Sequence, residues 1–431
     1  MRAHSSSPDR LTVLVTGADQ HQGLAIIRGL GLGGAAVIAC GPHRRSLGFY
    51  SRYADASFTY TSPFRDRAAF IDDILDIVRR TRPTLILPGV ESTLVALDAC
   101  RERIEREVTL AAPSSAAFAF AIDKCETVRL AERLCVPVPR TIGGGSVESI
   151  LDQAVMLRFP VAIKPRGSSL YATTTHALEF KVRYARTLDD LRRVLAELGA
   201  HSGVPLVQEY ARGRGLCVDV VARHGVPIAM FAYAKSREVP LSGGVSVVRE
   251  TVPLDERVER YVTALCSELR WHGIAMVEFK HDAIDDRYTL MEINGRFSAA
   301  TALSLDAGLN LPDLVARLYS GGALPDARPP YTLGVRERWL SGDLTALRDR
   351  VMQRRNDLDA TPPSPLPSKG RAIRAFVADF RRGMKYDEFK WWDWKPSVVE
   401  SAAIGTLLAG WARSVIVGAV KTVLRGMRRA D

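Results

Sequence analysis

The first 122 residues alternate between short apolar runs and segments in which apolar residues recur with helical spacing. The runs are LTVLVT, AAVIAC, TLILPG and VTLAAP, and the helical segments lie near residues 22–32, 68–80 and 91–103. Strands that alternate with helices at this pitch indicate a parallel sheet wrapped by helices. We therefore predict a parallel α/β domain over residues 11–122.

The composition changes at VPVPRTIGGG, residues 136–145, where two prolines and three glycines mark a linker or a strand that enters a new unit. We place a domain boundary just before this stretch, at residue 123. Beyond it, consecutive strand candidates are joined by short turns, which is typical of antiparallel sheet. Residues 123–325 are therefore predicted as an α+β domain. Its strand candidates are FPVAIK, HALEFKVRYA, PLVQEYA, GLCVDVVARHG, PIAMFAYAKS, GIAMVEFKHDA and RYTLMEINGRF.

The last third of the chain has a different pattern. Residues 326–368 are predicted as a connecting segment with the proline-rich hinge TPPSPLPSKG, and residues 369–431 as a basic, tryptophan-containing helical tail. Its last helix, near 398–427, has apolar residues at helical spacing, interrupted by Arg413 and Lys421. Three interpretations stay open for it: a helix docked on the body, a helix on an anionic membrane surface, and a membrane-spanning helix.

Composition and charge narrow the functional class. With 431 residues, of which 47% are hydrophobic and 25% charged, the chain is long enough for two or three globular domains. The tail from residue 369 holds thirteen lysines and arginines against six acidic residues, so it carries +7 of the net +11. The rest of the chain is close to neutral, and we expect no nucleic-acid partner.

The N-terminus and the cysteines indicate a cytoplasmic protein. Residues 1–10 are polar and run directly into the first strand, so we expect a disordered leader rather than a signal peptide. The six cysteines form no CxxC pair and have no zinc-site spacing with the eight histidines. We expect reduced, mostly buried thiols and assign them no chemistry.

The most informative stretch is LMEINGRF, residues 290–297. In a strand, side chains alternate between faces, so Glu292, Asn294 and Arg296 share one face while Met291 and Ile293 lie on the other. Two oxygen donors suit Mg²⁺, and a guanidinium suits phosphoryl oxygens. A half-exposed strand whose polar residues face water explains the same pattern. This stretch alone leaves both interpretations open.

Four other places, taken singly, are explained either as ordinary structural or solvent-exposed residues or as parts of a site. They are Lys124 in AIDKCETVRLA, Lys164 in VAIKPRGSS, the run VQEYARGRG, and Glu278 in MVEFK. Their order along the chain, followed by MEINGR, resembles the ATP-grasp superfamily of carboxylate–amine ligases. The ATP-binding domain of the carbamoyl-phosphate synthase large chain is of this type. The resemblance covers roughly residues 11–325 and implies a pre-ATP-grasp α/β domain before a two-lobed ATP-grasp domain.

The resemblance implies roles for individual residues. Lys124 and Lys164 would contact the ATP phosphates from opposite sides, and Arg296 would stabilise the transferred phosphoryl group. Small residues would close over the phosphates, and the QEYA stretch would form the hinge against adenine. Two carboxylates and an amide would hold Mg²⁺, with Mn²⁺ as the alternative. The small residues are Gly167, Ser168 and Ser169, and the hinge residues are Gln208, Glu209, Tyr210 and Ala211. The metal ligands are Glu278, Glu292 and Asn294.

Two features limit the resemblance. Where many relatives place an acidic residue that binds the ribose, this chain has Gly-Arg-Gly-Leu at 213–216. The run AKSREVPLSGGVSVVRE, 234–250, looks like a loop found in a subset of the family. We expect at least one of its cations Lys235, Arg237 and Arg249 to face the acyl phosphate or the acceptor carboxylate. Solvated charges on a hairpin are the alternative.

The implied reaction has two steps. A small carboxylate takes the γ-phosphoryl group of ATP, and an amine, or a thiol, then displaces phosphate from the acyl phosphate, leaving ADP and phosphate as products. An amino acid, or an acid group on a larger acceptor, is the expected kind of substrate. The alternative function is a non-catalytic ATP-binding regulatory or scaffold protein. Contact with a membrane surface through residues 398–427 is the further partner interaction that the sequence suggests.

Overall fold

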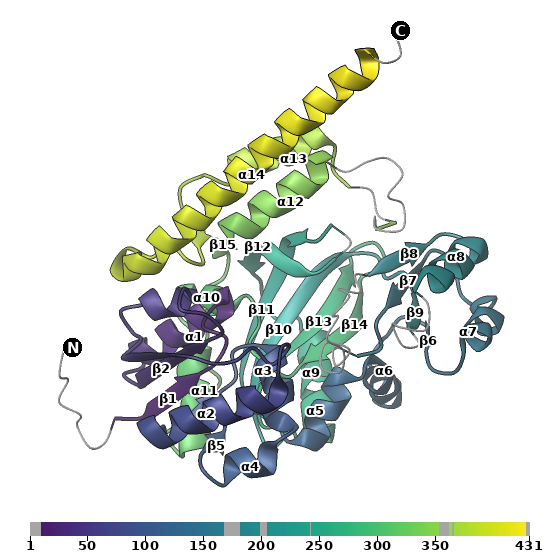
Figure 1. The fold of residues 1–431 in the computed structure, drawn as a ribbon. Helices are drawn as coiled ribbons and strands as arrows, with labels where there is room; N and C mark the ends of the chain where they lie inside the picture. Colours follow the sequence, from purple (N-terminus) through teal and green to yellow (C-terminus); the bar gives the residue numbers. More distant parts are fainter. Residues whose placement is uncertain are drawn as a thin grey trace.

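The chain forms three sheets in the computed structural model (Figure 1). The structure describes residues 10–167, 182–198, 205–241, 243–352, 362–363 and 366–427, with side chains as far as Trp411. The predicted disordered leader lies almost entirely outside this described part of the chain.

The N-terminal domain is the predicted parallel α/β unit. Its five strands are all parallel and lie in the order β3-β2-β1-β4-β5. Because parallel neighbours need a crossover, helices connect them and cover the faces of the sheet. The elements are β1 (Thr12–Val15), α1 (His21–Leu32), β2 (Ala36–Gly41), η1 (Leu47–Tyr50), β3 (Ala56–Thr59), α2 (Arg67–Thr81), β4 (Leu85–Leu87), α3 (Glu91–Asp98), α4 (Arg101–Glu105) and β5 (Thr109–Leu110).

A seven-stranded sheet in the order β14-β13-β10-β11-β12-β15-β16 forms the centre of the molecule. All its neighbours are antiparallel except β15 and β16, which confirms the predicted α+β class. The elements are β10 (Arg214–Arg223), β11 (Val226–Val239), β12 (Val245–Thr251), α9 (Glu256–Glu268), β13 (Gly273–Asp282), β14 (Arg287–Asn294), α10 (Thr301–Asp306), α11 (Leu311–Ser320), β15 (Arg336–Arg338) and β16 (Lys385–Tyr386).

A smaller lobe lies beside the central sheet (Figure 1). Its four strands, in the order β6-β9-β7-β8, and its two helices enclose a separate apolar core that includes Ile163, Leu191 and Val207. Two short helices lead into it from the N-terminal domain. The elements are α5 (Ser115–Ile122), α6 (Lys124–Arg133), β6 (Thr141–Ile142), α7 (Val147–Ala154), β7 (Val161–Lys164), β8 (Arg183–Ala185), α8 (Leu188–Leu198) and β9 (Leu206–Glu209).

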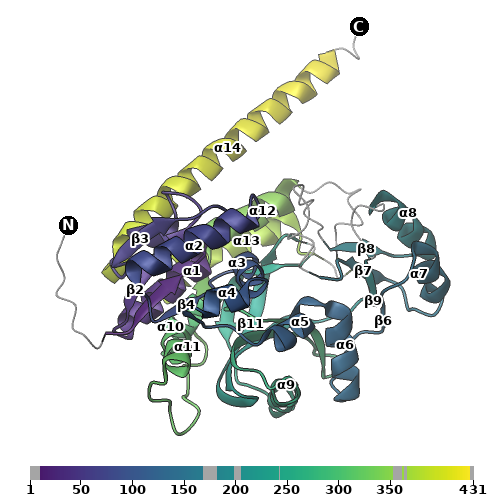
Figure 2. The ribbon, with the colours of Figure 1, turned by 60° about the horizontal axis from the view of Figure 1, so that its bottom comes forward.

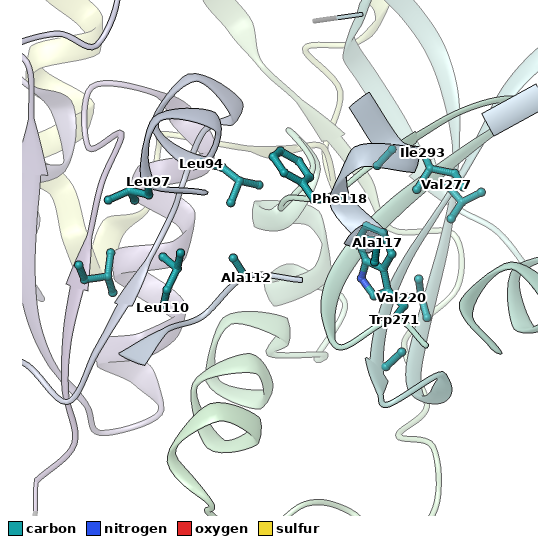
Figure 3. Packing of buried hydrophobic residues seen from close by; sticks show 14 of the residues in the cluster. Leu94, Leu97, Leu110, Ala112, Ala117, Phe118, Val220, Trp271, Val277 and Ile293 are labelled. Carbon is teal, nitrogen blue, oxygen red and sulfur yellow. The ribbon is translucent and has the colours of Figure 1, made fainter. Parts of the chain in front are cut away.

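One continuous apolar cluster fixes the N-terminal domain to the central sheet. Figure 3 shows side chains of the N-terminal domain on one side and of the central sheet on the other, with Phe118 of α5 between them. A Cβ atom at Gly295 would lie only 2.8 Å from the Phe118 ring. The glycine of MEINGR is therefore required for close packing at the end of β14.

The C-terminal region contains α12 (Leu340–Met352), α13 (Lys369–Ala378), η4 (Trp391–Asp393) and α14 (Trp394–Met427). The predicted basic helical tail is present as α14, but residues 385–393 before it belong to the body. The buried Arg28 of α1 donates to Asp393 at 2.8 Å and to the carbonyl oxygens of Asp387 and Glu388. Apolar periodicity could not predict this attachment, because buried polar contacts hold it.

Most of α14 extends away from the body, as both views show (Figures 1 and 2). Leu407 and Leu408 are 39% and 44% exposed, so this part of the helix is not the docked helix that the sequence allows. Within the described residues, we find no helix that combines the length and apolarity needed to span a bilayer. Contact with a membrane surface stays a prediction.

Candidate active site

Two glutamates face each other across neighbouring strands of the central sheet. Glu278 of β13 is paired in register with Glu292 of β14, and directly opposite residues of an antiparallel pair lie on the same face. The register shifts immediately beyond Glu278, so the sequence alternation is interrupted at Met291. Met291 therefore lines the same cavity as Glu292, whereas strict alternation predicts the opposite face.

A cavity of about 630 Å³ brings together most of the predicted site residues. It is bounded by the smaller lobe, the central sheet and the C-terminal helices α12 and α13. Arg350 and Phe376 of these helices line it, and neither could be predicted from a local motif. Ser168 and Ser169 lie outside the described residues. The predicted residues that line the cavity are Lys124, Lys164, Gln208, Glu209, Tyr210, Ala211, Lys235, Arg237, Glu278, Glu292 and Arg296.

Lysines from two elements approach Glu292. The ammonium group of Lys124, at the start of α6, lies 4.0 Å from the Glu292 carboxylate. Burial acts to raise the pKa of Glu292, but Lys124, a hydrogen bond from Asn294 and two further lysines outweigh it and lower the pKa to about 2. Burial lowers the pKa of Lys164 to about 8; Glu292 opposes this effect and Lys124 adds to it. The cavity therefore holds a carboxylate that stays ionised at neutral pH and a lysine that titrates near pH 8.

Lys235 of β11 is the partner of the other glutamate. Its ammonium group is 2.8 Å from Glu278, 3.1 Å from Glu238 and 3.1 Å from the Gly244 carbonyl oxygen. The Lys235 side chain is only 5% exposed. Burial acts to lower its pKa, but the two carboxylates outweigh burial and raise it. Lys235 was one of three candidate cations in the sequence; its acidic partners become visible only once β10, β11 and β13 are aligned.

Arg296 lies at the end of the motif and is held by its neighbours. Its guanidinium donates to the Asn294 side-chain oxygen at 3.2 Å and to the Phe297 carbonyl oxygen at 3.0 Å. Asn294 in turn donates to Glu292 at 2.9 Å. Asn294 and Gly167 are not among the cavity-lining residues; Gly167 instead pairs with Asp123 beside Lys124.

The predicted hinge stretch is anchored to the smaller lobe. Gln208 is buried and donates to the Thr141 hydroxyl at 2.9 Å, and Glu209 accepts from the Arg158 amide at 2.9 Å. The Tyr210 amide donates to the Pro160 carbonyl oxygen at 3.0 Å. The backbone of the hinge is thus fixed up to Tyr210, and Ala211 is the next lining residue.

Of the other two predicted cations, Arg237 lines the cavity but is paired, whereas Arg249 is not in the site. Arg237 contacts Asp343 and Asp379, each at 2.7 Å. Arg249 is 0% exposed and is paired with Glu337 and Asp387. The structure thus corrects the expectation for Arg249, because two buried carboxylates hold its guanidinium and it lines neither described cavity.

A second cavity, of about 440 Å³, adjoins the first. Arg296, Gln22 and Val245 line both. The other walls come mainly from the N-terminal domain, beyond the carboxyl ends of its parallel strands, where open α/β sheets bind ligands. The polar and charged residues that the structure adds are Asp19, Gln20, Ser62, Arg67, Glu91, Ser92 and Thr93.

Comparisons with known proteins point to one family. Residues 203–342 match the family model "ATP-grasp in the biosynthetic pathway with Ter operon". The formate-dependent phosphoribosylglycinamide formyltransferase of Ignicoccus hospitalis is 29% identical over 140 residues, which are 32% of this chain and 33% of that protein. The D-aspartate ligase of Enterococcus faecium is 25% identical over 206 residues, 45% of this chain and 48% of that protein. The chain thus spans between a third and a half of these relatives.

The fold is shared with solved structures over a longer stretch. Biotin carboxylase from Campylobacter jejuni superposes with a TM-score of 0.59 at 18% identity, over 75% of this chain and 74% of that chain. At this identity the likeness concerns the fold alone. The matched family model, the shared fold and the order of the charged motifs agree with one another, and over residues 203–342 the chain matches the ATP-grasp family.

Proposed function

We propose that this protein is an ATP-dependent ligase that activates a carboxylate as an acyl phosphate and joins it to an amine. The observation that carries the proposal is the position of Arg296, which lines both cavities. A guanidinium at that junction can neutralise a phosphoryl group as it passes from a nucleotide in one cavity to an acid in the other.

The first cavity suits ATP. Lys124 and Lys164 supply cations for the phosphates, and the hinge after Gln208 offers backbone groups to the adenine edge. The apolar side chains of Met276 and Met291 line the same cavity and suit the faces of a base.

The carboxylates suit Mg²⁺. Glu278 and Glu292 lie opposite each other and present hard oxygen donors, and Asn294 adds an amide beside them. When bound, Mg²⁺ supplies charge neutralisation for the phosphoryl oxygens. Glu278 and Glu292 would hold the ion, and Lys235 keeps Glu278 oriented while the site is free of it.

The proposed reaction balances without a protein nucleophile. A carboxylate oxygen attacks the γ-phosphorus, and the bond to the β-phosphate oxygen breaks to release ADP. An amine nitrogen then attacks the acyl carbon, phosphate leaves, and the amine loses a proton. Two relatives, a formate-dependent enzyme and a D-aspartate ligase, are each named after a carboxylic acid. These names support a carboxylic acid as the substrate class. The residues of the site position the reactants and neutralise charge.

Phosphate release measured with ATP, Mg²⁺ and paired pools of carboxylates and amines tests the proposal. We expect ADP and phosphate to form only when acid and amine are both supplied. AMP as the product would contradict an acyl-phosphate route. Tight ATP binding without turnover across a broad panel would favour a non-catalytic nucleotide-binding protein instead.

The pKa of Lys164 predicts a pH dependence of nucleotide binding. Below about pH 8 Lys164 is an ammonium ion, and above it the side chain becomes neutral. Bound phosphates favour the charged form, so the pKa rises on binding and the affinity falls as the pH increases beyond about 8, by up to roughly tenfold per pH unit. Titration with a non-hydrolysable ATP analogue measures this. Lys164→Met should bind the analogue more weakly, and its affinity should not depend on pH in this range. If the affinity of this variant still fell above about pH 8, another group would be responsible for the titration.

Filling the second cavity should separate nucleotide binding from turnover. Ser92, in the first turn of α3, lines only the second cavity. We expect Ser92→Phe to reduce acceptor-dependent phosphate release at least tenfold by occupying the acid site, with the affinity for ATP unchanged. Ser92→Ala is the matched control and should keep turnover. Equal turnover in both variants would place the acceptor elsewhere.

A further inference from the structure

Three potential metal ligands from distant parts of the chain meet outside the two cavities. They are His21, the first residue of α1, Glu388, which follows β16, and Glu400 of α14. One ligand atom from each lies within 4.8 Å of the others, and His21 Nδ1 is 2.7 Å from a Glu388 carboxylate oxygen. Within the described residues, none of the three lines either cavity, so the cluster is separate from Glu278 and Glu292.

The carboxylates of this cluster are buried without the hydrogen bonds that buried charges require. The Glu388 side chain is 0% exposed, and Glu400 is 6% exposed. Among the described atoms, Oε2 of Glu388 and Oε1 of Glu400 have no hydrogen-bond partner, and Oε1 of Glu388 has only the 2.7 Å contact to His21 Nδ1. A buried carboxylate left in this state is costly, so a missing partner is indicated.

Two arginines that contact the segment around Glu388 are already engaged by other groups. Arg28 donates its side chain to Asp393 and to the carbonyl oxygens of Asp387 and Glu388, and Arg249 is paired with Glu337 and Asp387. Two buried carboxyl groups, Glu388 and Glu400, thus share the cluster with a single imidazole.

We propose that His21, Glu388 and Glu400 form a binding site for one divalent cation of the Zn²⁺ or Mn²⁺ class. An imidazole nitrogen and two carboxylate oxygens are a donor set that such ions accept, and the ion supplies the positive charge that the cluster lacks. Ligand atoms about 2.1 Å from a tetrahedral ion lie about 3.4 Å apart. The widest separation in the cluster, at most 4.8 Å, must therefore close by up to about 1.4 Å on binding, while His21 and Glu388, now 2.7 Å apart, move slightly apart.

The position of the site defines what the ion would do. It would connect the N-terminus of α1 to the start of α14, which the chain places at opposite ends of the sequence. Gln22, the residue after His21, lines both cavities. The ion would therefore be structural, holding the C-terminal region against the helix that bounds the proposed active site.

Metal binding by the full-length protein tests this without reference to turnover. The protein is stripped with a chelator and dialysed against Zn²⁺ or Mn²⁺ in the absence of nucleotide, which would otherwise bring metal to the proposed ATP site. Metal content is then measured by mass spectrometry. We expect one tight ion per chain, and a loss of affinity in Glu400→Gln and His21→Gln that exceeds the roughly 10- to 100-fold cost of removing an outer-shell partner. The ion should also raise Tm in the unsubstituted protein and in neither variant.

Two control variants distinguish this site from other groups of the protein that could bind the metal. His43→Gln makes the same substitution at an exposed histidine, and Glu292→Gln alters the proposed ATP site; both should retain the ion. Mn²⁺ binds thiolates poorly, so its retention distinguishes the cluster from the cysteines. Circular dichroism shows whether each variant is folded. The use of two variants keeps the test valid if one of them does not fold. An unsubstituted protein that binds no more metal than His21→Gln and Glu400→Gln would overturn the proposal.

Discussion

Glu292→Gln is expected to lower acceptor-dependent ATP turnover by roughly 100- to 1,000-fold, the usual cost of removing one preorganised electrostatic group from an active site. Glutamine keeps the shape of the side chain and removes its charge. Because the pKa of Glu292 is about 2, the carboxylate is ionised throughout the working pH range, and no change of pH should restore activity. The rate of phosphate release at saturating ATP and Mg²⁺ measures the effect.

A matched substitution on the same sheet controls for Glu292→Gln. Glu250 of β12 lines neither cavity and lies 3.6 Å from Arg336 near the surface. Glu250→Gln should retain turnover within a few-fold. If Glu292→Gln retained turnover to the same extent, the assignment of this carboxylate to the metal and phosphate site would be wrong.

Arg249→Met is expected to lower the free energy of unfolding by about 3–5 kcal/mol, the typical cost of removing one partner from a buried ion pair. The substitution leaves Glu337 and Asp387 buried without their cation. ATP affinity of the folded fraction should not change, because Arg249 lies outside both cavities. Urea denaturation followed by tryptophan fluorescence measures the loss.

The same substitution at an exposed ion pair provides the comparison. Arg192 of α8 pairs with Asp189 at 2.8 Å with both side chains largely exposed, and Arg192→Met should change stability by less than about 1 kcal/mol. If Arg249→Met instead left stability intact and abolished turnover, the catalytic role expected from the sequence would be restored.

Arg296 and Arg249 show which site residues can be predicted from the sequence and which cannot. Arg296 could be predicted because its side-chain partner Asn294, which in turn donates to Glu292, lies only two residues away in the same motif. Arg249 has an equally suitable position in its run, but its partners Glu337 and Asp387 are 88 and 138 residues away. Nothing local distinguishes a guanidinium that is available to a ligand from one that is neutralised by distant carboxylates.

The same limit applies to the fold. The parallel N-terminal domain and the antiparallel central sheet follow from strand periodicity and loop length, which are local properties. The register shift at Met291 depends on the exact pairing of β14 with β13, and the attachment of residues 385–393 to the body depends on partners far away in sequence. Apolar spacing predicts neither, because one is a backbone irregularity and the other is built from buried polar groups.

The contact between Arg28 and Asp393 also bears on how the protein is made. These residues are 365 positions apart, and both side chains are almost completely buried in the finished molecule. During synthesis, domains generally fold from the N-terminus as they leave the ribosome. Arg28 is synthesised 365 residues before its carboxylate partner Asp393. The first domain can therefore complete its sheet during translation, whereas α1 acquires its final electrostatic environment only after Asp393 has been synthesised.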